Sequence, residues 1–132
     1  MKIKLFFDTS VFFAAFVKNK YYARKILHDF DAEKFTTLLV LKEFRKVLSS
    51  KGYSSYDINY FVEVMESVCI VVNDYPAAQF KKFEIADKSD KPFLCAAVRL
   101  GCILISEDNA FLKDAKRYVK SMSSEGIIRN YK

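Results

Sequence analysis

Short apolar runs and longer amphipathic stretches alternate along this chain. The runs at residues 3–7, 35–39, 69–72 and 102–105 contain β-branched and aromatic residues, which predicts buried strands. Between them, apolar residues recur at helical spacing, which predicts helices over residues 11–17, 21–30, 40–50, 54–68 and 91–100. The remaining predictions are a short helix from Pro76 to about Phe83, a helix over 110–115, an edge strand over 118–122 and a last helical turn that starts at 123–125.

Residues with special backbone preferences mark the ends of several predicted helices. Thr9 and Ser10 can cap the first helix with their hydroxyls. Gly52 and Gly101 each follow a predicted helix, as expected of a residue that accepts a left-handed backbone. Pro92 lies in the first turn of its helix, where no backbone N–H is needed.

The order of the elements indicates the fold class. Strands alternate with helices throughout the chain, and this order predicts an α/β fold. We expect a three-layer α/β/α sandwich with a central, mostly parallel sheet. No internal repeat or linker interrupts the 132 residues, so we expect a single domain over 1–132.

Composition and charge limit the classes of protein to which this chain can belong. Hydrophobic residues make up 52% of the chain, which is ample for a core, and no apolar stretch approaches the length that spans a bilayer. The apolar N-terminus is interrupted by Asp8 and lacks a cleavage site for a signal peptide, so we expect a cytoplasmic protein without membrane contact. The net charge of +6 either favours a polyanionic partner such as nucleic acid or reflects a solvated lysine-rich surface.

The cysteines and the one histidine argue against zinc and against histidine-based catalysis. Cys69, Cys95 and Cys102 lie in or beside apolar runs, without a CxxC pair, and are expected to be buried free thiols. His28 is expected on a helix, partly exposed, and no zinc-ligand spacing surrounds it.

Four acidic residues lie where metal ligands would lie. Asp8 and Asp108 follow predicted strands, whereas Glu43 and Asp90 belong to predicted amphipathic helices. The carboxyl ends of parallel strands open into one crevice, where ligands bind. Carboxylates gathered there repel one another unless a hard divalent cation neutralises them. The set therefore suits Mg²⁺ or Mn²⁺, as one ion or as two.

Each acid also has a purely structural explanation. Asp8 and Asp108 can cap helices, and Asp90 can complement a helix dipole. Asp87, three residues before Asp90, could share or take over the role of Asp90. Glu43 lies at the margin of an apolar helix face, where it either reaches into the crevice or pairs with a neighbouring cation on the surface.

Positive side chains would have to attract a nucleic acid to such an acidic crevice. The candidates, of which only a minority is expected to touch substrate, are Lys18, Lys20, Arg24, Lys25, Lys42, Arg45, Lys46, Lys113, Lys116 and Arg117.

Four segments stand out, at residues 3–10, 41–48, 89–97 and 103–112. Together they resemble PIN-domain proteins, in particular the VapC-like toxins of toxin–antitoxin pairs. The first strand of that family, with its Asp-Thr-Asn/Ser ending, resembles residues 3–10, and its Glu-bearing helix resembles residues 41–48. Its Asp followed by an Ala-rich helix resembles residues 89–97, and its final strand with Thr/Ser and Asp resembles residues 103–112. The order and spacing of these segments match over nearly the whole chain.

The resemblance implies a PIN-like sandwich and metal-dependent hydrolysis of RNA, with water attacking in line with departure of the 3′-oxygen. Asp8, Glu43, Asp90 and Asp108 would form the acidic site, with Ser10 and Ser106 as its small polar residues. Glu107 is an extra acid where many members have a neutral residue, so Glu107 either assists or replaces Asp108. The resemblance further implies a homodimer and a small antitoxin protein that inhibits the enzyme.

The leading hypothesis is therefore a Mg²⁺- or Mn²⁺-dependent endoribonuclease that acts as a toxin. The alternative is a catalytically silent PIN-like module that binds nucleic acid or protein. A DNA nuclease is a third reading, and the sequence shows no inserted arch or pair of DNA-binding helices that would favour it. The many aromatic residues of the early helices are either core or part of a hydrophobic patch for self-association or an antitoxin segment.

Overall fold

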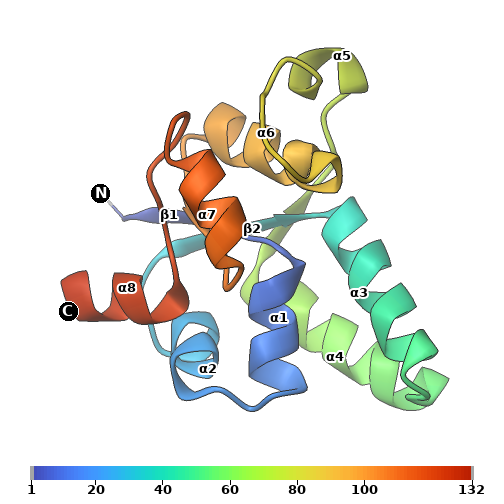
Figure 1. Ribbon diagram of the computed structural model, residues 1–132. Helices are drawn as coiled ribbons and strands as arrows, with labels where there is room; N and C mark the ends of the chain where they lie inside the picture. The colour runs from blue at the N-terminus through green and yellow to red at the C-terminus, as the bar shows by residue number, and fades with distance from the viewer. Residues whose placement is uncertain (1, 132) are drawn as a thin grey trace.

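The computed structural model describes residues 2–131 as alternating strands and helices (Figure 1). The strands are β1 (Lys4–Phe7), β2 (Glu33–Thr37), β3 (Ile70–Val72), β4 (Ile103–Ile105) and β5 (Ser121–Met122). The helices are α1 (Thr9–Phe16), α2 (Tyr21–His28), α3 (Leu38–Ser50), α4 (Ser55–Val68), α5 (Ala77–Phe80), α6 (Lys91–Leu100), α7 (Asn109–Ala115) and α8 (Ser124–Asn130), with a 3-10 turn η1 (Lys88–Asp90) before α6.

The five strands form one sheet in the order β3-β2-β1-β4-β5, and every neighbouring pair is parallel. β1 is the central strand and pairs with β2 on one side and β4 on the other. Because all strands run the same way, their carboxyl ends lie along a single edge of the sheet. The prediction of a mostly parallel sheet is confirmed.

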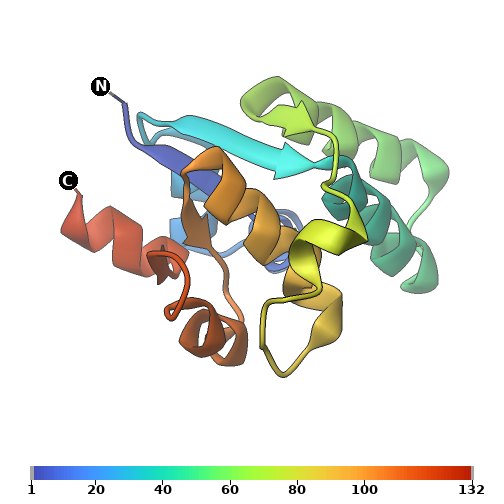
Figure 2. The same ribbon diagram turned by 90° about the horizontal axis from the view of Figure 1, so that it is seen from above.

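Helices cover both faces of this sheet. α5 and α6 lie on one side of it, whereas α1, α2 and α4 lie on the other (Figures 1 and 2). α6 packs directly against β1 and β4, and α1 packs between α2 and α3. The expected three-layer α/β/α sandwich is therefore confirmed.

A buried aromatic cluster fixes α1 against α3 and α4. Phe12 and Phe44 are fully buried and lie 6.4 Å apart between ring centroids. Phe16 stacks on Phe61 with centroids 5.2 Å apart, which joins α1 to α4. Aromatic pairs of this kind add to the stabilisation from buried area. The cluster holds the start of α1 and the Glu43-bearing helix α3 in a fixed relation.

The prediction of a strand over 35–39 is wrong at its end, because Leu38 and Leu39 begin α3. Thr37 caps this helix, with its hydroxyl accepting from the backbone N–H of Val40 at 3.4 Å. The carboxylate of Asp74 accepts from the N–H of Leu39 at 2.8 Å. A cap supplied from 35 residues away is invisible to local sequence patterns, and it starts the helix two residues early.

Other boundaries also differ from the predictions. The first helix is capped by Asp8 instead of Thr9 and Ser10, as its carboxylate accepts from the N–H of Ser10. α2 ends at His28 rather than at residue 30, and α5 ends at Phe80 rather than near residue 83. Phe83 instead packs edge-to-face on Tyr118, with ring centroids 5.0 Å apart.

Cys69, Cys95 and Cys102 are buried free thiols, as predicted, and His28 is exposed on α2. Burial raises the pKa of the Cys69 thiol to about 12, so this group stays a thiol at neutral pH. No helix within residues 2–131 combines the length and apolar character needed to cross a membrane.

Candidate functional site at the carboxyl edge of the sheet

Asp8 lies directly after the central strand, at the carboxyl edge of the sheet, and only 4% of it is exposed. Its Oδ1 accepts hydrogen bonds from the backbone N–H of Ser10 at 3.1 Å and from Ser10 Oγ at 2.5 Å. Its Oδ2 accepts from Ser106 Oγ at 2.6 Å. Asp8 therefore caps α1 and at the same time belongs to a polar network, so its structural and its functional explanation are compatible.

Ser10 and Ser106 tie the start of α1 to the loop after β4. Their hydroxyl oxygens lie 3.2 Å apart, and Ser106 is fully buried. Ser10 Oγ accepts from the N–H of Glu107 at 2.8 Å, and Ser106 Oγ accepts from the N–H of Asp108 at 3.1 Å. The two serines thus hold the backbone of both candidate acids beside Asp8.

A groove of about 370 Å³ opens above this network, and we call it the acidic groove. Its polar lining is Thr9, Ser10, Lys18, Glu43, Glu107 and Asp108. Glu43 is half-buried on α3, and Asp108 is exposed at the start of α7. Segments 25 residues or more apart in the chain thus converge on one groove. Of the ten candidate cations, Lys18 is part of its lining.

Asp108 also caps α7, because its Oδ1 accepts from the N–H groups of Ala110 and Phe111 at 3.0 and 3.2 Å. It lines a second, smaller cavity of about 50 Å³ together with Asp87 and Asp90. Asp108 therefore lies between the acidic groove and Asp90.

Asp90 is half-buried at the junction of η1 and α6, and its side chain makes no cap to that helix. Asp87 is exposed and caps η1, since its carboxylate accepts from the N–H and the hydroxyl of Ser89 at 3.0 and 2.7 Å. These bonds lower the pKa of Asp87. A structural role thus accounts for Asp87 more fully than for Asp90.

Asp90 lies within electrostatic reach of the other acids. Partial burial and, in decreasing order, the charges of Asp87, Asp8, Asp108 and Glu43 together raise the pKa of Asp90 to about 7. Burial raises the pKa of Asp8 to about 6, although hydrogen bonds from Ser10 and Ser106 oppose the rise. The repulsion that neighbouring acids exert on Asp90 is the electrostatic condition under which a cation binds favourably.

Glu107 is held differently from the other acids. Its Oε1 accepts a hydrogen bond from the hydroxyl of Ser124, which is fully buried at the start of α8. The half-buried Glu107 carboxylate lines the acidic groove and also a neighbouring pocket on the side of α2. The bond from Ser124 restrains this carboxylate, which the groove and the pocket share.

The donor chemistry of the site fits a hard divalent cation, although the carboxylates do not form a closed cage. Within residues 2–131, no three Asp, Glu, His or Cys side chains are already close enough to enclose a metal ion. Mg²⁺ commonly takes only one or two carboxylates and keeps several waters. The hydroxyl oxygen Oγ1 of Thr9 at the groove is inaccessible and has no hydrogen-bond partner among the described residues. The carboxylates that line the groove, those of Glu43, Glu107 and Asp108, are oxygen donors of the kind that such a cation takes.

Two residues of the site were not expected from the sequence. Thr9 was predicted only as a helix cap, and Ser124 only as part of a last helical turn. The Ser124–Glu107 bond joins residues 17 positions apart, and no sequence signal announces it. Whether the predicted acids act as a catalytic or metal-binding set stays a prediction at this point.

No known family model and no curated protein sequence matches the chain significantly. Solved structures do match it. VapBC2 of Rickettsia felis, solved bound to a promoter DNA fragment, aligns with a TM-score of 0.72 at 12% identity, over 92% of this chain and 98% of that one. VapBC-1 of nontypeable Haemophilus influenzae aligns with a TM-score of 0.69 at 12% identity, over 93% and 99%. A PilT N-terminus domain protein of Sulfolobus solfataricus aligns with a TM-score of 0.63 at 16% identity, over 96% and 92%.

The class defined by these features is an all-parallel α/β sandwich with carboxylates along one edge of the sheet. More narrowly, the chain has the PIN-domain (PilT N-terminus) fold in its VapC-like form. At 12–16% identity the likeness establishes the fold, and function has to be argued from the site.

Proposed function

We propose that this protein is a Mg²⁺- or Mn²⁺-dependent endoribonuclease and the toxin of a toxin–antitoxin pair. The observation that carries the proposal is geometric: Glu43 and Asp108 line one groove, Ser106 ties Asp108 to the buried Asp8, and Asp108 shares a second cavity with Asp90. Four carboxylates from separate elements thus gather at the edge of the sheet where α/β folds bind ligands, and their charges contribute to the raised pKa of Asp90. A fold shared with VapBC proteins supports the same reading.

In this proposal the four carboxylates hold the cation, and the surrounding residues fix their geometry. Ser10 and Ser106 orient both oxygens of the buried Asp8, so that this side chain loses little freedom when it binds. Glu43 and Asp108 face the open groove, and Asp90 stands behind Asp108. When bound, Mg²⁺ or Mn²⁺ supplies charge that neutralises the scissile phosphate and lowers the pKa of a bound water.

Lys18 is the residue of this chain that would draw the RNA backbone to the groove. Its side chain is exposed and lines the groove beside Glu43 and Asp108. An ammonium group there offsets the repulsion between the acids and a phosphodiester. Water attack in line with departure of the 3′-oxygen leaves a 5′-phosphate and a 3′-hydroxyl on the products.

A small antitoxin protein and a homodimer belong to the same proposal. Structures similar to this chain include VapBC proteins and a toxin–antitoxin complex of Klebsiella pneumoniae, the latter with a TM-score of 0.61 and 16% identity over 81% of this chain and 89% of that one. Expression of the chain should arrest growth, and co-expression of its antitoxin should restore it. Analytical ultracentrifugation at micromolar concentration should show a dimer, and a monomer alone would contradict this part.

The second candidate is a catalytically silent module that binds nucleic acid or protein. It is favoured by the observation that Asp8, Asp87 and Asp108 all cap helical turns, which gives them a role without a metal. The two candidates differ in cation binding. Only the enzyme requires a specific site for Mn²⁺.

Calorimetric titration with Mn²⁺ separates these candidates. The enzyme should show saturable binding that disappears in Glu43→Gln, because this change removes a charge and leaves the shape of the side chain. Asp57→Asn is the matched control, since Asp57 is exposed in the first turn of α4. Equal Mn²⁺ binding by Glu43→Gln and the wild type would remove Glu43 from the site, and no binding by the wild type would favour the silent module.

A further inference from the structure

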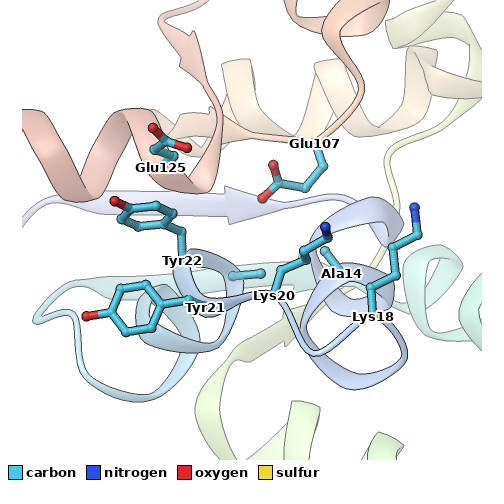
Figure 3. Close-up of a pocket in the computed structure, with 8 residues that line it drawn as sticks. Ala14, Lys18, Lys20, Tyr21, Tyr22, Glu107 and Glu125 are labelled. Atoms are coloured by element: carbon cyan, nitrogen blue, oxygen red, sulfur yellow. The ribbon is translucent and has the colours of Figure 1, made fainter.

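A pocket of about 330 Å³ adjoins the acidic groove beside the turn that joins α1 to α2 (Figure 3). We call it the tyrosine–lysine pocket, and its polar and aromatic lining is Lys18, Lys20, Tyr21, Tyr22, Glu107 and Glu125. Lys18 and Glu107 line both this pocket and the acidic groove. A nucleic-acid strand that lies along the acidic groove can therefore place its next nucleotide in the tyrosine–lysine pocket.

We propose that the tyrosine–lysine pocket binds one unstacked nucleotide of single-stranded RNA next to the cleaved phosphodiester, and that it prefers a base with an exocyclic amino group. The inference rests on the proposed ribonuclease function and adds a substrate subsite to it. Three features of the pocket carry the argument: its cations, its exposed aromatic ring and its carboxylate.

The turn between the helices places two cations at the pocket. Asn19 has a left-handed backbone with φ of 53°, a conformation that asparagine tolerates better than most residues. The N–H of Lys20 donates to the carbonyl of Ala14 at 2.9 Å, which folds the turn back on α1. The side chains of Lys18 and Lys20 then both extend toward the Glu107 side of the pocket (Figure 3). Two ammonium groups so placed can bind the phosphates on either side of one nucleotide.

Tyr21 supplies an aromatic surface that the core does not use. Its side chain is 59% exposed at the first position of α2, and its ring meets Tyr22 edge-to-face with centroids 5.2 Å apart. Lys25 Nζ lies 5.8 Å from the centroid of the same ring and adds positive charge beside it. Exposed aromatic rings flanked by cations are the usual platform on which proteins stack single-stranded bases.

Glu107 gives the pocket a hydrogen-bond acceptor with a fixed position. The hydroxyl of the buried Ser124 donates to its Oε1, and the N–H of Glu107 is bound by Ser10. A carboxylate has about four acceptor positions, and the bond from Ser124 uses one of them. Cytosine and adenine present an amino donor to such a group, whereas uracil presents a carbonyl acceptor at the corresponding position. Glu125 adds less, because its carboxylate is engaged by Arg129 at 2.8 Å.

The test compares two RNA hexamers that differ at the base edge, oligocytidylate and oligouridylate. Their binding to the full chain is measured by fluorescence anisotropy in EDTA, which prevents metal-dependent cleavage. The wild type should bind oligocytidylate more tightly than oligouridylate. Glu107→Gln should reduce this preference, because a side-chain amide can donate to the uracil carbonyl.

Substitutions of Tyr21 test the stacking contact directly. Tyr21→Ala should weaken oligocytidylate binding about 10- to 100-fold, the range expected for loss of one stacked base. Tyr21→Phe should retain the affinity, because the ring remains. Tyr60→Ala is the matched control, since Tyr60 on α4 is also 59% exposed and does not line the pocket, and it should bind like the wild type.

Each outcome separates this subsite from the proposed ribonuclease function. If the wild type binds RNA, and Tyr21→Ala and Tyr60→Ala bind it with equal affinity, the subsite is overturned and the ribonuclease proposal stands. A pocket that binds a protein partner instead of RNA would give this result. Loss of binding in Tyr21→Ala alone, without metal-dependent cleavage by the wild type, supports the subsite on a silent module. No RNA binding by the wild type in EDTA overturns the subsite, and the ribonuclease proposal is then judged by metal-dependent cleavage alone.

Discussion

Replacing Asp8 by Asn should stabilise the metal-free protein while abolishing its activity. Burial raises the pKa of Asp8 from its ordinary value of 3.8 to about 6, so the folded state disfavours the ionised carboxylate that neutral pH imposes. A tenfold change in proton affinity corresponds to about 1.4 kcal/mol, and the rise therefore costs about 3 kcal/mol of stability once the group is ionised. Asn keeps the size of the side chain and an acceptor for the hydrogen bonds from Ser10.

The sign of the effect follows from the direction of the shift. An acid whose pKa is raised on folding binds its proton more tightly in the folded state, so wild-type stability falls as pH rises from about 4 to above 6. Below pH 4 both states are protonated, and the penalty is absent. The Asp8→Asn variant lacks the titrating group and should gain stability over the wild type only across and above this window.

Urea denaturation in EDTA, at pH 4 and at pH 8, measures this difference. The variant should exceed the wild type by up to about 3 kcal/mol at pH 8 and by little at pH 4. Asp31→Asn is the control, because its ion pair with Lys2 at 3.1 Å is exposed and contributes less than about 1 kcal/mol. An Asp8→Asn protein that is less stable at pH 8 and equally less stable at pH 4 would refute the reasoning, since Asp8 would then act mainly as a helix cap.

Two further changes test the hydrogen bonds at Asp8 and the end of α6. Ser106→Ala removes the hydroxyl that donates to Asp8 and accepts from the N–H of Asp108, so it should cost about 1–3 kcal/mol of stability in chemical denaturation and raise the pKa of Asp8 further. An unchanged Asp8 titration, followed by NMR, would show that this hydrogen bond is unimportant. Gly101→Ala should lower stability by about 1 kcal/mol in thermal unfolding, because Gly101 ends α6 with φ of 69°. No atom lies within 4 Å of the added carbon, so a larger loss would point to a cause other than the left-handed backbone.

The fold was predictable because three of its strands, β1, β3 and β4, are largely apolar and the strands are separated by amphipathic helices. Leu5, Phe6 and Phe7 are fully buried on a central strand with helices on both faces, and such strands appear in the sequence as continuous apolar runs. The start of α3 was not predictable, because Asp74 supplies part of its cap from a distant loop.

The candidate site was only partly predictable, for a related reason. Asp8 and Asp108 follow strands, and parallel strands bring such residues to one edge of the sheet, so their neighbourhood follows from topology. The bond between Ser124 and Glu107 and the unpartnered hydroxyl of Thr9 depend on side-chain packing between distant segments. Local patterns carry no information about such contacts.

The dual roles of the acids explain why the sequence left their function open. Asp8 caps α1 through Oδ1 and contacts Ser106 through Oδ2, and Asp108 caps α7 while it lines the acidic groove. An aspartate after a strand that precedes a helix is placed for both tasks by the same geometry. An experiment that removes the charge of the carboxylate and keeps the shape of the side chain distinguishes helix capping from metal binding.

The most direct test of the central claim is cleavage of a single-stranded RNA by the wild type beside Asp8→Asn, with Mg²⁺ or Mn²⁺ and with EDTA. We predict cleavage by the wild type that requires the cation, yields 5′-phosphate ends and disappears in a well-folded Asp8→Asn protein. Cleavage that persists unchanged in Asp8→Asn, or that survives EDTA, would contradict the account.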